Sequence, residues 1–459
     1  MPKTLPKTLH KCRIKREPKC LPGVAPGLVA ITLLAASAAE AQNAGAGGAG
    51  YSLFGAPAYT SGMFDAARPP DHGFTVGDWI VDPEIFAGLV FNDNLYRTSG
   101  ARQSGVGLRI RPAFLAERNG GLSKTTITAY GDIQRYDWNG HAGAGANAAY
   151  GALRIVHTYQ PLRDLVFRLE GGVSHSRDAF DLNGGALNGW QTLPGQFNPS
   201  FLPQSSTNFL ASVSAQKEFG NLFVGVGFSA QRTTYSGGAG LVIPGLSASA
   251  ENYNQYTLSG RLGYHFGPDF YAFADAATNW RSHDTGNFNS RGSRLLAGIG
   301  AERFSLFAGE LYAGYSAQDY RDARGQNTSG GVFGGRVSWF PTRALSFTAQ
   351  LDQQLSDGTP QSAFGAVRSA SGKTTTASLS AIYNVTSYWS ILAKVGYAQS
   401  RYSDSTRPDH RVFAGLSANY TFWRNWSVTA DYQFSRLKSN FAGASFKQNV
   451  TSLGVTYRF

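Results

Sequence analysis

The sequence predicts a transmembrane, antiparallel β-barrel of about eighteen strands (16–18), with both termini on the periplasmic side. From Ile85 to Phe459, stretches of alternating apolar and polar residues indicate strands whose two faces meet different surroundings. Their connections alternate between tight turns and long polar loops, which is typical of outer-membrane barrels. The chain offers no run of eighteen apolar residues for a spanning helix, and a closed barrel is the other structure that satisfies every backbone group in lipid.

Residues 1–41 have the features of an export signal peptide. A basic segment is followed by an apolar stretch that begins at Val24, and Ala39-Glu40-Ala41 fits a small-residue cleavage site. We therefore expect the mature chain to begin at Gln42. Both cysteines of the sequence precede this site, so the mature chain is expected to lack thiols.

The remaining chain divides into two parts. Residues 42–80 are rich in Gly, Ala and Pro and predict a periplasmic lead-in, whereas residues 81–459 predict the barrel. The composition agrees with a barrel, since 55 residues are Gly, 13% are aromatic and 15% are charged. The net charge of +12 falls to +7 without the signal peptide, and the remaining basic residues are scattered. No nucleic-acid partner is expected.

The strands can be followed in order along the chain. In the first clear example, residues 106–114, Val106, Leu108 and Ile110 share one face, while Arg109 and Arg111 share the other. A face that carries arginines is expected to meet water. The same two-sided pattern recurs at residues 165–173, 222–231, 345–352 and 427–434.

The connections sort by length into two sets. Counted back from Phe459, the short turns all fall on the side of the C-terminus, which is the periplasmic side in this class of barrel. They are expected near residues 161–163, 219–221, 267–269, 303–305, 341–343, 386–388 and 424–425. Trp and Tyr near several of these turns, such as Trp339, Trp389 and Trp426, predict an aromatic girdle at the membrane boundary.

Three segments resemble known sequences. Residues 450–459 resemble the C-terminal signature that the barrel assembly machinery recognises, with Tyr457 and Phe459 at its aromatic positions. Residues 82–98 and 103–112 are similar to the first two strands of the putative β-barrel porin type 2 family. The resemblance would cover residues 80–459. It implies a location among lipid and lipopolysaccharide in the outer membrane, reached with the help of periplasmic chaperones and the assembly machinery.

Catalytic motifs are missing from the sequence. It contains no Gly-x-Ser-x-Gly elbow, no Walker loop and no His-Glu-x-x-His helix, and its histidines are scattered. His283-Asp284 falls in a predicted extracellular loop but lacks a second acid or a nucleophile. We therefore predict neither an enzyme nor a cofactor or metal site.

Charged residues on the polar faces of the strands are the candidate functional residues. They would either set the selectivity of a water-filled lumen through their local field or neutralise one another as ladders that brace the wall. The set comprises Arg109, Arg111, Asp132, Arg154, Arg168, Glu170, Arg261, Asp275, Arg294, Glu302, Glu310, Arg336, Asp352, Lys394, Arg411 and Asp431.

The longest connection, residues 178–206, is a candidate constriction loop. It is the third predicted extracellular connection, and its rings Trp190, Phe197 and Phe201 would favour folding into the lumen. A loop exposed on the surface, binding a partner, is the alternative.

The sequence as a whole favours a porin-like passive diffusion channel for small hydrophilic solutes or ions, biased toward anions by the inward arginines. The alternative is a non-conducting outer-membrane component of exopolysaccharide export or surface assembly, whose loops bind polysaccharide-export components. Whether the chain forms a homo-oligomer is left open by the sequence.

Overall fold

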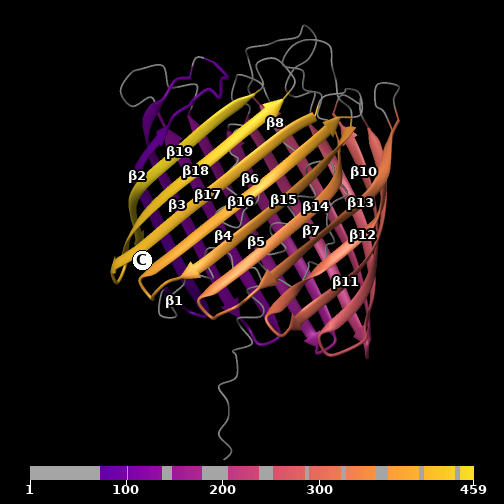
Figure 1. The fold of residues 1–459 in the computed structure, drawn as a ribbon. Helices are drawn as coiled ribbons and strands as arrows, with labels where there is room; N and C mark the ends of the chain where they lie inside the picture. Colours follow the sequence, from indigo (N-terminus) through magenta and orange to yellow (C-terminus); the bar gives the residue numbers. More distant parts are fainter. Residues whose placement is uncertain are drawn as a thin grey trace, which may run out of the picture.

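The computed structural model describes residues 73–100, 102–136, 147–177, 205–236, 252–284, 289–321, 327–357, 371–402, 408–439 and 445–459. These residues form one sheet in which strands β2 to β19 follow each other antiparallel around a ring (Figure 1). The strands are β1 (Phe74–Val76), β2 (Trp79–Asn92), β3 (Gly105–Asn119), β4 (Ser123–Arg135), β5 (Ala148–Leu162), β6 (Leu165–Arg177), β7 (Ser205–Phe219), β8 (Leu222–Ser236), β9 (Tyr253–His265), β10 (Phe270–His283), β11 (Ser290–Phe304), β12 (Phe307–Tyr320), β13 (Thr328–Trp339), β14 (Leu345–Asp357), β15 (Ser371–Asn384), β16 (Trp389–Tyr402), β17 (Pro408–Trp423), β18 (Trp426–Ser439) and β19 (Phe446–Arg458).

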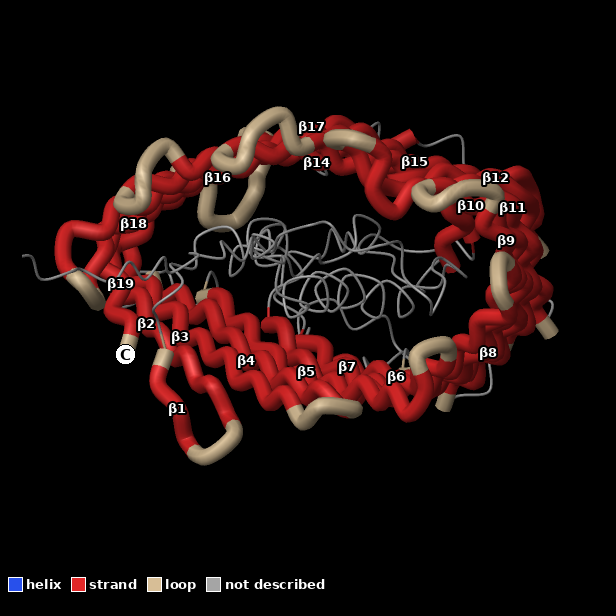
Figure 2. Tube along the Cα trace, turned by 90° about the horizontal axis from the view of Figure 1, so that it is seen from below, coloured by secondary structure: helices blue, strands red, loops and turns tan. Residues whose placement is uncertain are grey.

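The ring is closed by pairing between its first and last long strands. β19 pairs with β2 from Val450, opposite Asn92, to Arg458, opposite Glu84. Figure 2 shows the resulting oval barrel along its axis, with β19 beside β2. The predicted antiparallel barrel is thus confirmed, and the eighteen strands β2 to β19 match the predicted number.

The described residues include no helix long and apolar enough to cross a membrane.

Alternation along the strands gives the barrel two chemically different faces. On β3, Val106, Leu108 and Ile110 are 42–45% exposed, whereas Arg109 and Arg111 on the opposite face are 5% and 8% exposed. Apolar side chains point outward and charged side chains inward, as the period of two requires in a closed sheet. The arginine-bearing face, which the sequence analysis expected to meet water, is therefore the inner face.

Short turns gather at one end of the barrel, together with the C-terminus and β1 (Figure 1). The turn between β7 and β8 has Gly220 in the left-handed region, with φ 64°, which glycine adopts at little cost. Outward-facing rings lie at this end, including the stacked pair Trp389 and Tyr420, whose centroids are 4.6 Å apart. The sorting by length agrees with the sequence analysis, and the assignment of this end to the periplasm stays a prediction.

A short hairpin precedes the barrel wall. β1 pairs with the start of β2, with Phe74 opposite Val81, and Gly77 in its turn has a φ of 59°. The sequence analysis placed these residues in the lead-in, because three residues of strand are too short for a recognisable alternation. The predicted constriction loop, residues 178–206 with Trp190, Phe197 and Phe201, lies outside the described residues except at its last two positions.

The seam between β19 and β2 is packed closely around two glycines. Gly88 and Gly454 lie on neighbouring strands, and the ring of Phe86 covers both on the inner side. A Cβ atom at Gly454 would lie 2.6 Å from the Phe86 ring and 2.4 Å from the carbonyl oxygen of Ala87. Glycine at this position therefore lets the ring lie flat across the seam.

We predict that Gly454→Ala destabilises the barrel, because the added methyl group has no space at the seam. Overpacking of this kind costs about 1–3 kcal/mol. The measurement is the temperature at which the refolded barrel loses its heat-modifiable mobility in gel electrophoresis. Gly171→Ala is the matched control, since a Cβ there meets no atom within 4 Å. Equal midpoints for the two variants would contradict the account of the seam.

Candidate functional site

The inner wall of the barrel contains the charged residues that the sequence singled out. Most of them are buried at inward positions, and Arg168 and Arg336 are partly exposed at inward positions as well. Glu302 differs, because it is exposed and follows the register shift that begins at Ala301 near the short-turn end of β11. The buried members are Arg109, Arg111, Asp132, Arg154, Glu170, Arg261, Asp275, Arg294, Glu310, Asp352, Lys394, Arg411 and Asp431.

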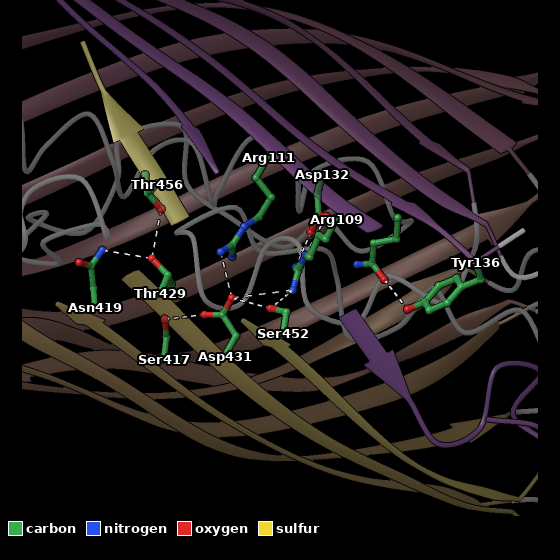
Figure 3. Close-up of polar contacts among 11 residues, drawn as sticks. Arg109, Arg111, Asp132, Tyr136, Ser417, Asn419, Thr429, Asp431, Ser452 and Thr456 are labelled. Carbon is green, nitrogen blue, oxygen red and sulfur yellow. Dashed lines mark hydrogen bonds and ion pairs between the residues drawn. The ribbon is translucent and has the colours of Figure 1, made fainter. Parts of the chain in front are cut away.

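The first group of polar side chains, which we call the closure cluster, consists of four charged residues and one serine. They are Arg109, Arg111, Asp132, Asp431 and Ser452. Arg109 donates to Asp132 with Nε at 3.0 Å and Nη2 at 2.5 Å, so the pair is bidentate. Its remaining nitrogen, Nη1, donates to Ser452 Oγ at 3.2 Å. Figure 3 shows Arg109 and Arg111 reaching from one side toward Asp431 on the other.

Asp431 is the acceptor that joins the two sides of this cluster. Its Oδ2 lies 2.9 Å from Nη2 of Arg111 and accepts a hydrogen bond of 3.0 Å from Ser452 Oγ. Its Oδ1 accepts from Ser417 Oγ at 2.6 Å. Because Arg111 belongs to β3 and Asp431 to β18, these bonds span the seam between β2 and β19. The cluster therefore fastens the barrel where its ends meet.

The second group lies on strands β9 to β12. Arg261 makes a bidentate pair with Asp275, at 2.7 and 2.9 Å, and its Nη1 lies 3.0 Å from Oε1 of Glu310. The hydroxyl of Tyr271 donates to the same oxygen at 2.6 Å. The Arg261 guanidinium also lies 4.2 Å from the centroid of the Phe273 ring. Every carboxylate here has a charged partner, which is how buried ions are accommodated.

Two smaller contacts engage further acids of the wall. Arg154 Nε lies 2.7 Å from Glu170 Oε1, and Arg168 lies 3.4 Å from the other oxygen of the same carboxylate. On the far wall, Asp352 accepts a hydrogen bond of 2.8 Å from the hydroxyl of Tyr312. At Arg154, Arg168 and Glu170, basic and acidic side chains thus lie side by side and brace the inner wall.

Two inward arginines, Arg336 and Arg411, form no ion pair with a carboxylate of the described residues. Within the described part of the chain, Arg411 forms no ion pair, and its guanidinium lies 5.7 Å from the centroid of the Phe413 ring. The ammonium of Lys394 lies 5.9 Å from the same ring. Arg336 donates to the neutral amide of Gln350 at 3.3 Å. Arg336 and Arg411 therefore present positive charge on the inner faces of β13 and β17.

The sequence analysis did not select the hydroxyl groups of these clusters. Ser452, Ser417 and Tyr271 are inward residues that complete the hydrogen bonds of Asp431 and Glu310. Their strand parity predicts an inward position, but a neutral hydroxyl group carries no charge that would distinguish it from other inward Ser and Tyr residues. The described residues contain no group of three His, Cys, Asp or Glu side chains that could hold a metal ion.

His283 and Asp284 do not form a catalytic pair in the structure. Asp284 lies beyond the end of β10, and its carboxylate makes a bidentate pair with Arg232 of β8, at 2.6 and 2.7 Å. The hydrogen bonds from Arg232 are the main reason that the pKa of Asp284 is lowered from its ordinary value. Asp284 therefore links the ends of β8 and β10 at the rim of the barrel through its pair with Arg232.

Comparison with protein families identifies the chain. The family model described as Putative beta-barrel porin 2 matches residues 69–459. The chain belongs to this family. The protein is accordingly an outer-membrane β-barrel, and porin and transporter barrels of this kind are typically non-enzymatic. No curated protein matches its sequence.

Several solved outer-membrane barrels have a similar course of the chain. The FrpB iron transporter from Neisseria meningitidis is 10% identical, with a TM-score of 0.45 over 84% of this chain and 83% of its own. The outer membrane protein opdK from Pseudomonas aeruginosa is 12% identical, with a TM-score of 0.39 over 84% of this chain and 100% of its own. The siderophore receptor PirA from Pseudomonas aeruginosa is 8% identical, with a TM-score of 0.40 over 85% and 81%.

We predict that Arg109→Gln destabilises the barrel by roughly 3 kcal/mol, because it leaves the buried carboxylate of Asp132 without its bidentate partner. The double variant Arg109→Gln/Asp132→Asn should lose less than the sum of the two single variants. Urea unfolding of the refolded barrel, followed by tryptophan fluorescence, measures these differences. Additive losses would mean that the two residues do not interact.

We also predict that Arg232→Gln raises the pKa of Asp284, because the variant removes the hydrogen bonds that hold it low. A depressed carboxylate pKa stabilises the folded state above the ordinary range of the carboxyl group. This contribution is lost as the pH falls through the lowered pKa. Carboxyl-carbon NMR titration of the detergent-solubilised protein measures the shift. A pKa of Asp284 that is the same in both proteins would contradict the pairing.

Proposed function

We propose that this protein is a passive diffusion channel for small hydrophilic solutes or ions, with a preference for anions. The observation that supports the proposal is the closed ring of eighteen strands with a charged inner face. Barrels of sixteen to eighteen strands are wide enough to leave an aqueous channel, whereas eight strands leave room only for side chains. Charged groups along such a channel bias which ions pass.

The preference for anions rests on how the inner charges are distributed. The acids Asp132, Asp431, Glu170, Asp275 and Glu310 are all engaged by arginines at short distances. Their fields are largely cancelled within the wall. Arg336 and Arg411 form no ion pair in the described part of the chain, so their positive fields extend into the lumen.

The proposal is tested by conductance of the refolded protein in a planar bilayer under a potassium chloride gradient. We expect stepwise openings and a reversal potential that indicates chloride preference. A folded, heat-modifiable barrel that never conducts would overturn the proposal. That outcome would favour the alternative of a non-conducting component of exopolysaccharide export or surface assembly.

We predict that Arg411→Gln lowers the chloride-to-potassium permeability ratio about fourfold. A unit charge roughly 8 Å from an ion in water contributes about 0.5 kcal/mol, which is close to a factor of two. The charge attracts chloride and repels potassium, so the two factors multiply in the ratio. Arg135→Gln is the matched control, because Arg135 is exposed on the outer face of β4. The reversal potential under the salt gradient gives the permeability ratio of each variant. An equal shift in the two variants would assign the effect to overall charge and contradict the role of Arg411.

A further inference from the structure

Basic side chains gather on the outer face of β16–β19, at the end that bears the long connections. We call this group the basic patch; it consists of Arg401, His410, Arg436, Lys438 and Lys447. Strand alternation places all five outward, since their neighbours Arg411, Leu437 and Gln448 are buried on the inner side. Arg401, Arg436, Lys438 and Lys447 are exposed, and His410 is partly exposed.

The strand register places these groups directly beside one another. Arg436 of β18 is opposite Lys447 of β19, and His410 of β17 is opposite Lys438 of β18. Directly opposed residues on neighbouring strands have Cβ atoms about 5 Å apart, and like charges at this spacing are destabilising. The arrangement of Arg436 and Lys447 is therefore unfavourable unless an anion lies between them.

No protein carboxylate supplies this anion in the described part of the chain. None of Arg401, Arg436, Lys438 and Lys447 forms an ion pair there. Asp409, beside His410, is buried on the inner face. The carboxylate of Asp93 accepts from the amide of Asn449 at 2.5 Å.

Two outward cations elsewhere on this rim have acidic neighbours. Arg232 of β8 pairs with Asp284, at 2.6 Å. Arg291 of β11 is opposite Asp319 of β12. Arg232 and Arg291 therefore differ from Arg436 and Lys447, which lie opposite each other without an acidic neighbour among the described residues.

An apolar surface continues from the basic patch toward the middle of the barrel. Val412, Tyr432 and Leu453 follow outward on the same strands and are 44%, 43% and 59% exposed. Lys447 is held with its ammonium 5.7 Å from the Phe434 ring, and His410 is hydrogen-bonded through Nδ1 to the hydroxyl of Tyr397 at 2.6 Å. A ligand that fits this surface carries anionic groups, which would contact the basic patch at the rim. It also carries acyl chains, which would lie along the apolar side chains toward the middle of the barrel.

We propose that the basic patch binds the phosphates of a lipid A-type glycolipid of the outer leaflet, whose acyl chains lie along the apolar face beneath. Arg and Lys form charge-assisted hydrogen bonds with phosphate oxygens. One phosphate placed between Arg436 and Lys447 removes their repulsion. This binding is on the outer face and does not depend on whether the lumen conducts.

The test measures binding of bis-phosphorylated lipid A to the refolded full chain by native mass spectrometry from a neutral detergent. We expect Arg436→Gln/Lys447→Gln to bind lipid A at least tenfold more weakly than the unmodified protein. The matched control is Arg135→Gln/Arg291→Gln, which removes two outward cations on other strands and should bind as the unmodified protein does. Heat-modifiable mobility verifies that each variant is folded.

Two further ligands distinguish the source of the phosphate. Lipid A without its phosphates should bind at least tenfold more weakly, and phosphatidylglycerol should not compete at equimolar concentration. Unchanged binding by the Arg436→Gln/Lys447→Gln variant would overturn the proposal. Equal binding of the dephosphorylated lipid, or equal binding of phosphatidylglycerol, would overturn it as well, since either would mean that the patch does not select a phosphorylated glycolipid.

Discussion

Hydrogen bonding between β19 and β2 is the interaction on which the rest of the structure depends. A sheet in hydrocarbon cannot leave an edge unpaired, because each unsatisfied backbone group costs several kcal/mol there. The residues that support this seam come from distant parts of the sequence. Phe86 covers Gly88 and Gly454, and Arg111 lies 3.9 Å above the Phe86 ring while it binds Asp431. Backbone pairing, ring packing and ion pairing thus act together at one place.

Closure also separates the charges of the protein into two populations. Inside, carboxylates such as Asp132, Glu170 and Asp275 are matched to arginines, whereas Arg336 and Arg411 form no ion pair within the described residues. Outside, the apolar belt ends in a rim where Arg232 has an acidic partner, whereas the described residues supply none to the arginines and lysines of the basic patch. The same residue type therefore braces the wall, sets a field in the lumen or faces the lipid headgroups, according to strand parity and to its neighbours across the sheet.

Strand parity could be predicted from the sequence, whereas specific contacts could not. A shift of one residue would exchange the two faces of a strand, so the alternation around Arg109 and Arg111 suffices to place both inside. The partner of Arg109 depends on the register between β3 and β4, and that of Arg111 on which strands meet at the seam. Neither follows from local pattern. Strand parity predicted an inward position for Glu302, but this residue is exposed. The regular alternation is interrupted there by a register shift between Ala301 and Phe304.

The most direct test of a wall between lipid and an aqueous interior is spin-label accessibility along β14, in a chain without Cys12 and Cys20. Single labels at Ser346, Thr348 and Gln350 should collide mainly with a water-soluble nickel chelate. Labels at Phe347, Ala349 and Leu351 should collide mainly with oxygen dissolved in lipid. Such alternation would support a polar inner face in contact with water. Equal accessibility of all six positions to either reagent would contradict it.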